Sequence, residues 1–314
     1  MVEQAKVVII GAGAVGSTFA YALMRSGLFG EIILVDVNRE RAKGEVMDLN
    51  HGLFFVPYVD VRAGDYSDCA GAAIVVITAG AKQKVGETRL DLVQRNVEIC
   101  KDIIAQVLHY TRDSIILMVT NPVDILTQVA YKVSGLPANR IIGSGTVLDS
   151  ARFRFMLSEH CKVDSRNVHA YVLGEHGDSE VAAWSLTHIG GIPILQFCSI
   201  CEVDCSVEDR ERISDAVRDS AYHVIESKGA TNFAVSLALE NIVGAIMRNS
   251  NSVLTVSTPL DGQFGISDVA LSVPAIINRE GVHRILESPL AEEELLGLRK
   301  SASVLREIMS QIEP

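Results

Sequence analysis

Three glycines near the amino terminus restrict the fold of this chain more than any other feature. Gly11, Gly13 and Gly16 stand in the spacing GxGxxG within VVIIGAGAVGSTFA, after a β-branched run and before a helical pattern. Such glycines permit a tight turn, close approach of the backbone to a pyrophosphate, and tight packing of helix on strand. Asp36 ends the next apolar run, where a carboxylate can accept both ribose hydroxyls and repel a 2′-phosphate. The pattern predicts dinucleotide binding, with NAD favoured over NADP, and a purely structural glycine turn is the alternative.

Short apolar runs alternate with helical patterns through the first half of the sequence. The runs are apolar throughout rather than at every second position, which is typical of strands covered on both faces in a parallel sheet. We expect strands at KVVII, EIILVDV, VDVRAG, AAIVVITAG, SIILMVTN and RIIGSG, and helices over about 14–26, 39–50, 89–109 and 123–133. This alternation predicts a Rossmann-type doubly wound α/β fold with a parallel sheet.

The pattern changes after about residue 144, and 314 residues are enough for two lobes. The second half predicts a helix from about 147 to 161, shorter strands such as NVHAYVLG, and a closing amphipathic helix in AEEELLGLRKSASVLREIMSQI. The late strands SVLTVST and DVALSVPAII are expected to pair antiparallel. We therefore expect an NAD-binding domain over residues 1–143 and an α+β substrate-binding and catalytic domain over residues 144–314, packed against each other.

Charge and hydropathy argue against nucleic acids and membranes as partners. The formal net charge is −11, which repels polyanions, so an anionic ligand must be held by arginines placed next to it. Residues 7–24 carry no charge, but the glycines interrupt them and favour strand, turn and helix over a membrane span. We expect no nucleic-acid partner, no membrane anchor and a cytoplasmic location.

The six cysteines are scattered through the chain, which favours free thiols in a reducing cytoplasm over a disulfide framework. The last three stand in CSICEVDC, for which zinc binding is the alternative reading, but no fourth ligand is apparent nearby. We therefore expect no metal site. The cysteines are Cys69, Cys100, Cys161, Cys198, Cys201 and Cys205.

One histidine and one acid–arginine pair stand in settings that suit chemistry. His176 lies in YVLGEHGDSE, where flanking glycines leave room for the ring to project into a site. Most of the eight histidines are expected to be surface or packed rings. Asp149 and Arg152, in GTVLDSARFRF, are three residues apart at the start of a predicted helix and so share one face. Taken alone, this pair also fits an ordinary helix ion pair.

The chain resembles the bacterial L-lactate dehydrogenases of the lactate/malate dehydrogenase family almost from end to end. Six motifs match in the order of the family: GAGAVG, TAGAKQKVGETR, VTNPVDI, GTVLDSAR, GEHGDSE and KGAT. The resemblance implies reversible reduction of pyruvate to L-lactate by NADH, a reaction of glycolysis and fermentation.

By position, the resemblance implies the catalytic residues. His176 matches the proton donor and acceptor, and Asp149 matches the carboxylate that orients it. Arg152 matches the arginine that grips the substrate carboxylate, and Arg89 matches the lid arginine that polarises the ketone. The chemistry agrees, because imidazole titrates near neutral pH and a guanidinium fork matches a carboxylate bidentately.

The resemblance also implies further substrate and cofactor contacts. Asn121 matches a residue that helps hold the reacting oxygen and lies on the cofactor side, and Thr231 lines the substrate side. The remaining positions that contact NAD in similar enzymes are Val15, Asp36, Arg41, Tyr66, Gly80, Ala81, Val119 and Ser144, besides the three motif glycines.

The segment GAKQKVGETR is expected to close over the site and to select the substrate. Gly80 and Gly86 would let the loop swing and bring Arg89 against the ketone. Gln83 would face the far end of the substrate, where similar malate dehydrogenases carry arginine. Burying the second carboxylate of oxaloacetate without a partner costs about a hundredfold or more in selectivity. Pyruvate is therefore the predicted substrate. A malate or broad 2-hydroxyacid dehydrogenase and a non-catalytic NAD-binding scaffold remain alternatives.

The resemblance further suggests regulation and assembly. Arg154 and His169 match positions where allosteric bacterial relatives bind fructose 1,6-bisphosphate between subunits. A surface arginine and an unrelated ring are the alternative reading. We expect fructose 1,6-bisphosphate as an activator and a homotetramer, a dimer of dimers, as the assembly.

Overall fold

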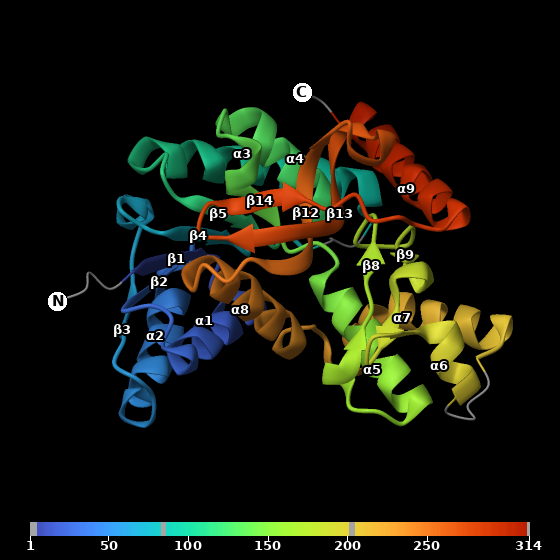
Figure 1. The fold of residues 1–314 in the computed structure, drawn as a ribbon. Coiled ribbons are helices and arrows are strands. Elements are labelled where there is room, and N and C mark those ends of the chain that lie inside the picture. Colours follow the sequence, from blue (N-terminus) through green and yellow to red (C-terminus); the bar gives the residue numbers. More distant parts are fainter. Residues whose placement is uncertain (1–4, 83–85, 201–204, 313–314) are drawn as a thin grey trace.

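A single twisted sheet forms the centre of the molecule in the computed structural model, which describes residues 5–82, 86–200 and 205–312 (Figure 1). Among these residues the strands follow the order β14-β13-β12-β6-β5-β4-β1-β2-β3. The six strands from β3 to β6 are parallel, in the order typical of a doubly wound dinucleotide-binding sheet. Their bounds are β1 (Lys6–Ile10), β2 (Glu31–Val35), β3 (Asp60–Ala63), β4 (Ile74–Ile77), β5 (Ile115–Met118) and β6 (Ile141–Gly143). The predicted Rossmann-type fold is confirmed.

Helices cover both faces of this sheet (Figure 1). Helices α1 (Ala14–Ser26), α2 (Arg39–His51) and α8 (Phe233–Met247) lie on one face, and α3 (Arg89–Tyr110), α4 (Val123–Ser134) and α9 (Glu292–Ser310) lie on the other. Successive strand residues point to opposite faces, so Ile9 joins the core beneath α1 while Ile10 joins the core beneath α3. This two-sided burial explains why the strands are apolar at every position.

Three antiparallel strands of the second half extend the sheet. They are β12 (Ser252–Asp261), β13 (Ser267–Asn278) and β14 (Gly281–Ile285), and β12 joins β6 through the pairing of Ser257 with Gly143. The expected antiparallel pairing of the late strands is thus present. The division into domains at residue 143 stays a prediction, and the sheet continues across it.

The second lobe is built around α5 (Val147–Cys161) and α7 (Val207–Lys228), with α6 (Ile194–Ile200) at its outer end (Figure 1). Phe153 and Leu157 of α5 meet Ile213 and Val217 of α7 in a separate core. Short strands complete this lobe: β10 (His188–Ile189) lies between β7 (Val168–His169) and β11 (Ile192–Pro193), and β8 (Val172–Leu173) pairs with β9 (Val181–Ala182). Gly174, directly after β8, pairs with Ser272 of β13 and so brings the chain back to the central sheet.

A membrane-spanning helix and a metal-binding cluster are two features that the sequence does not lead us to expect. Among residues 5–82, 86–200 and 205–312, no helix combines the length and the apolar character needed to cross a membrane. The same residues contain no group of three or more histidine, cysteine or acidic side chains placed to hold a metal ion. Cys201, one member of the CSICEVDC motif, lies outside the described residues.

Candidate active site

The glycine-rich turn between β1 and α1 leaves a backbone cradle at the start of the helix. Gly11 has φ +110°, and a Cβ on Gly16 would stand 1.9 Å from the Gly11 carbonyl oxygen, so close packing requires both glycines. Gly13 differs, because a Cβ built there meets no atom within 4 Å. Gly13 also caps α1 without a side-chain hydrogen bond, and no acid lies in the first turn. The helix N–H groups are therefore available to a phosphate.

Asp36 stands beside this cradle at the end of β2. Its Oδ2 accepts a hydrogen bond from the Ala12 N–H at 2.7 Å, and its Oδ1 accepts one from the Asn38 N–H at 2.8 Å. The side chain is fixed next to the glycine turn and stays partly exposed. A carboxylate held in this way can still accept hydrogen bonds from ribose hydroxyls. The cradle and the acid together fit a dinucleotide.

Most of the other predicted cofactor residues follow the carboxyl ends of neighbouring strands. The Ala81 N–H donates to Asn96 Oδ1 at 2.8 Å, and a Cβ on Gly80 would stand 2.2 Å from the Thr120 methyl carbon. Close packing therefore gives Gly80 a role besides the expected loop movement. The others in this region are Val15 at the start of α1, the half-buried Tyr66 in a 3₁₀ turn, Val119 after β5, and Ser144 after β6, whose N–H donates to Met118. Ligands of open α/β sheets bind at this edge.

Arg41 is placed differently from these residues. It lies on α2 with its side chain about half exposed, and its Nε is 3.9 Å from Glu45 Oε1. A surface ion pair at this distance contributes little to stability.

The predicted catalytic residues of the second lobe meet at one carboxylate. Asp149, in the first turn of α5, is 1% exposed. Its Oδ1 accepts a hydrogen bond from Arg152 Nη1 at 2.7 Å, and its Oδ2 lies 2.6 Å from His176 Nδ1. Asp149 and Arg152 share a face of α5 as the spacing predicts, and the return through β8 brings His176 to the same acid. The three side chains form one connected cluster.

This cluster favours a protonated imidazole. Burial alone would lower the pKa of His176, but the Asp149 carboxylate outweighs it and raises the pKa to about 9. Burial opposes ionisation of Asp149 in turn, yet His176 and Arg152 hold the pKa of that carboxyl below its usual range. Because Nδ1 faces Asp149, Nε2 is the ring atom left to exchange a proton with a ligand.

Arg89 begins α3, directly after the helix cap. The Thr88 hydroxyl oxygen accepts a hydrogen bond from the Asp91 N–H at 3.1 Å, which fixes the start of the helix. The Arg89 guanidinium is 72% exposed and 3.5 Å from Asp178, two residues beyond His176. The opposite oxygen of Asp178 accepts a hydrogen bond from the Tyr222 hydroxyl at 2.9 Å. Arg89 is thus near the segment that carries the histidine. Gln83 lies outside the described residues.

The two remaining predicted substrate residues, Asn121 and Thr231, lie on segments that hydrogen bonds connect to neighbouring helices. Asn121 follows β5, and its carbonyl oxygen accepts a hydrogen bond from Asn96 Nδ2 at 3.1 Å. Thr231 lies between α7 and α8 and is partly exposed. Its neighbour Asn232 donates to the Thr18 hydroxyl of α1 at 3.0 Å, which links this segment to the helix that follows the glycine turn.

Two acids near His176, the buried Asp124 and the half-buried Glu180, were not singled out from the sequence. Asp124 Oδ2 accepts the backbone N–H of His176 at 2.8 Å, and burial raises the pKa of this carboxyl to about 6. Glu180 is also close enough to influence the ring, and burial raises its pKa to about 8. An acid within the apolar sequence VDILTQVA was a signal for Asp124. Glu180 carries no comparable signal, because acids are common in loops.

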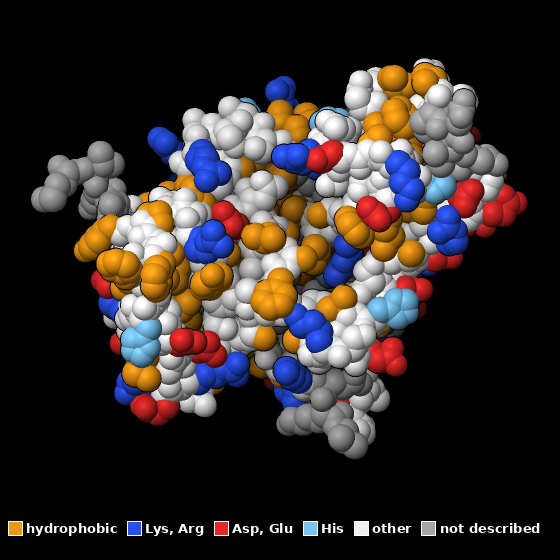
Figure 2. Space-filling model, turned by 90° about the horizontal axis from the view of Figure 1, so that it is seen from below, with side chains coloured by type: hydrophobic (Ala, Val, Ile, Leu, Met, Phe, Trp, Pro, Cys, Tyr) orange, Lys and Arg blue, Asp and Glu red, His pale blue; other side chains and the backbone are white. Residues whose placement is uncertain are grey.

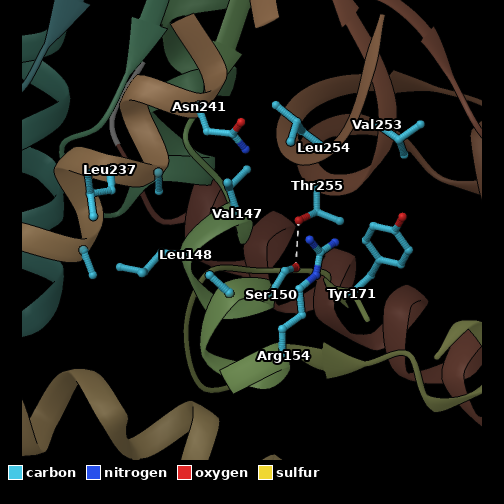
Figure 3. A pocket seen from close by; sticks show the side chains of 13 residues that line it. Val147, Leu148, Ser150, Arg154, Tyr171, Leu237, Asn241, Val253, Leu254 and Thr255 are labelled. Carbon is cyan, nitrogen blue, oxygen red and sulfur yellow. Dashed lines mark hydrogen bonds between the residues drawn. The ribbon is translucent and has the colours of Figure 1, made fainter. Parts of the chain in front are cut away.

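The predicted anion-binding residues lie away from this cluster. Arg154 borders a cavity of about 270 Å³ between α5, α8 and β12 (Figure 3). Its guanidinium carbon lies 5.2 Å from the centre of the Tyr171 ring, and its Nε donates to the Ala170 carbonyl at 2.9 Å. His169 is exposed on β7, paired with His188 of β10. Arg154 is thus hydrogen-bonded to the residue next to His169.

Known proteins resemble this chain over almost its whole length. Residues 5–143 match the family described as lactate/malate dehydrogenase, NAD binding domain, and residues 146–314 match lactate/malate dehydrogenase, alpha/beta C-terminal domain. The L-lactate dehydrogenase of Acetivibrio thermocellus is 58% identical over 98% of this chain and 97% of its own length. The L-lactate dehydrogenase of Thermoanaerobacter pseudethanolicus is 53% identical over 98% and 99%.

Solved structures agree with these similarities. The minor L-lactate dehydrogenase of Enterococcus mundtii, in its ligand-bound form, superposes with a TM-score of 0.96 at 40% identity and covers 99% of both chains. MGS-M5, a lactate dehydrogenase from a Medee basin deep-sea metagenome library, gives a TM-score of 0.94 at 45% identity over 98% of both chains.

Proposed function

The chain belongs to the lactate/malate dehydrogenase family and is an NAD-dependent enzyme, and we propose that it reversibly reduces pyruvate to L-lactate. The names of its relatives and the arrangement of Asp149, His176 and Arg152 support this proposal. The single observation that carries it is that one buried carboxylate holds both an imidazole and a guanidinium.

Each side chain of the cluster has a distinct role in the proposed reaction. Bound at the glycine cradle, the cofactor supplies the hydride, which no amino-acid side chain can provide. Arg152 binds the substrate carboxylate through its fork of N–H donors and so fixes which face of the ketone is presented. His176 donates a proton from Nε2 to the ketone oxygen. Asp149 orients the ring and stabilises its charged form.

Four further residues complete the proposed substrate site. Arg89 polarises the ketone when the segment before α3 closes, and removal of water strengthens that interaction. Asn121 helps to hold the reacting oxygen, and Thr231 borders the substrate. Gln83 is the proposed specificity residue, because a neutral amide offers no partner for the second carboxylate of oxaloacetate.

The proposal is tested by following NADH oxidation with pyruvate. Wild-type protein is expected to turn over, and His176→Asn is expected to lose at least about a hundredfold in kcat, because general acid catalysis contributes that much. His223→Asn, which changes an exposed histidine of α7, is the matched control and should retain wild-type rates. Wild-type protein that oxidises no NADH with pyruvate would contradict the proposed function.

Activation by fructose 1,6-bisphosphate and assembly into a homotetramer extend the proposal. The half-buried Arg154, which donates to the backbone carbonyl of residue 170, supports a role in binding an anion near His169. Hydrophobic side chains on the face in Figure 2, and exposure of 91% for Phe54 and 82% for Phe55, support subunit contacts. We expect the bisphosphate to lower the KM for pyruvate, with mass photometry reporting the assembly. A cytoplasmic location stays a prediction.

A further inference from the structure

Asp124 is a buried acid that the proposed reaction leaves without a role. It lies in the first turn of α4, is 2% exposed, and is followed by the buried apolar residues Ile125 and Leu126. Its Oδ1 makes no hydrogen bond of ordinary geometry among the described residues, although the buried Ser257 hydroxyl is close enough to lower the pKa of this carboxyl. Burying a carboxylate with one unpaired oxygen costs free energy, and such costs concentrate at functional positions. The contact made by the other oxygen indicates what that function is.

Asp124 Oδ2 accepts the backbone N–H of His176 at 2.8 Å, across 52 residues of sequence. The preceding N–H, of Glu175, donates to the Ser301 hydroxyl of α9 at 2.7 Å. Two successive backbone groups are thus held by side chains from two helices on the same face of the sheet. Glycines at positions 174 and 177 flank this segment, and Gly174 has φ +92°. A segment with this much backbone freedom needs such anchors to keep a ring in one place.

We propose that Asp124 is a positioning residue for His176, anchoring its backbone and adding a second negative charge to the surroundings of the imidazole. This inference rests on the proposed function of His176 as proton donor. It adds an acid on α4 to the reaction machinery otherwise contributed by α3, α5 and the loops.

The charge of Asp124 is present in the pH range where it is needed. Burial raises the pKa of Asp124 to about 6, so the carboxyl is ionised at neutral pH and above. Burial lowers the pKa of His176, but Asp149 raises it to about 9, and Asp124 also raises it. The Asp124 carboxyl is therefore already ionised at the pH where the imidazole loses its proton. The charged or titratable groups near the ring are Asp149 and Arg152 on α5, Asp124 on α4, and Glu175 and Glu180 close to His176 in the chain, and Arg218 on α7 acts on Glu180.

The inference is tested with Asp124→Asn, which keeps an oxygen for the His176 N–H and removes the charge. We expect the alkaline limb of kcat/KM for pyruvate to move down by about half to one pH unit, because a nearby opposite charge shifts a pKa by this order. Above pH 9, kcat/KM for pyruvate should be lower than that of wild type by up to about tenfold. Near pH 6 it should stay within about twofold of wild type. Asp124→Ala also removes the anchor, so kcat should fall at every pH while NADH affinity is unchanged.

Glu294→Gln provides a matched control. Glu294, in the first turn of α9, is likewise a buried acid and is 7% exposed. It accepts a hydrogen bond from the backbone N–H of Ser185 at 2.9 Å. Its replacement should lower the melting temperature without moving the alkaline limb. An Asp124→Asn enzyme whose alkaline limb coincides with that of wild type would overturn the inference.

A titration that does not depend on turnover separates this inference from the proposed function. The ring resonances of His176, assigned by comparison with His176→Asn, should titrate at lower pH in Asp124→Asn than in wild type. Wild-type protein inactive with pyruvate contradicts the proposed function, whereas an unchanged ring titration contradicts only the role of Asp124. If Asp124→Asn does not fold, the wild-type His176 amide proton decides the matter. Its resonance should shift with a midpoint near pH 6, and a constant resonance between about pH 5 and 8 overturns the inference.

Discussion

Asp149 and His176 are 27 residues apart in the sequence, and their side chains are 2.6 Å apart in the structure. The pair joins the first turn of α5 to the loop after β8, so neither element carries the site alone. Arg152 bonds to the opposite oxygen of the same carboxylate at 2.7 Å. One buried negative charge therefore sets the positions of a proton donor and an anion-binding fork.

The rate of pyruvate reduction should depend on pH through His176. Reduction needs the protonated ring, so kcat/KM for pyruvate is expected to be level below about pH 9 and to fall tenfold per unit above it. Lactate oxidation needs the neutral ring and should rise over the same range. The folded pKa lies above the ordinary value of about 6.5, so this pair contributes stability below that value and loses it as pH rises through about 9. A reduction limb centred near pH 6.5 would contradict this assignment.

Replacing Asp149 with asparagine should strongly reduce the catalytic rate. The amide keeps the volume but no longer stabilises the imidazolium or fixes its tautomer, so kcat should fall by about 10³ to 10⁴. The alkaline limb should move toward about pH 6.5. Asp164→Asn is the matched control, since Asp164 also pairs with an arginine, Arg166, at 2.7 Å but is exposed. A kcat within tenfold of wild type for Asp149→Asn would argue against its role.

Gly13 and Gly16 should respond in opposite ways to substitution. A side chain at Gly13 meets no protein atom within 4 Å, so Gly13→Val should leave the melting temperature of cofactor-free protein nearly unchanged and weaken NADH binding at least about tenfold. A Cβ at Gly16 collides with the Gly11 carbonyl, so Gly16→Ala should destabilise the fold by about 1–3 kcal/mol. Thermal melts and NADH fluorescence titrations measure both effects. Gly13→Val with wild-type NADH affinity would show that the cradle does not hold the cofactor.

Gln83→Arg should shift the substrate preference toward oxaloacetate. An arginine at this position offers a partner to the second carboxylate, so the ratio of kcat/KM for oxaloacetate to that for pyruvate should rise about a hundredfold. Gln106→Arg adds the same charge on the exposed part of α3 and should leave the ratio unchanged. Wild-type protein that prefers oxaloacetate would contradict the choice of pyruvate.

Local patterns in the sequence predicted the elements well, because their causes are local. The helix expected over about 147–161 spans Val147–Cys161, and the shared face of Asp149 and Arg152 follows from helical spacing. Contacts between distant segments had no such local signal. The meeting of His176 with Asp149 was implied by family resemblance, and the contact of Asp124 with a backbone N–H was not foreseen. A side chain that binds a backbone group leaves no partner residue to recognise in the sequence.

The complex with NADH and oxamate tests the central claim most directly, because oxamate carries a carboxylate beside a carbonyl and is not reduced. A crystal structure of this complex should place the oxamate carboxylate on the Arg152 guanidinium in a bidentate contact. His176 Nε2 should lie within about 3 Å of the adjoining carbonyl oxygen. Oxamate bound with Arg152 and His176 directed into separate cavities would contradict the account.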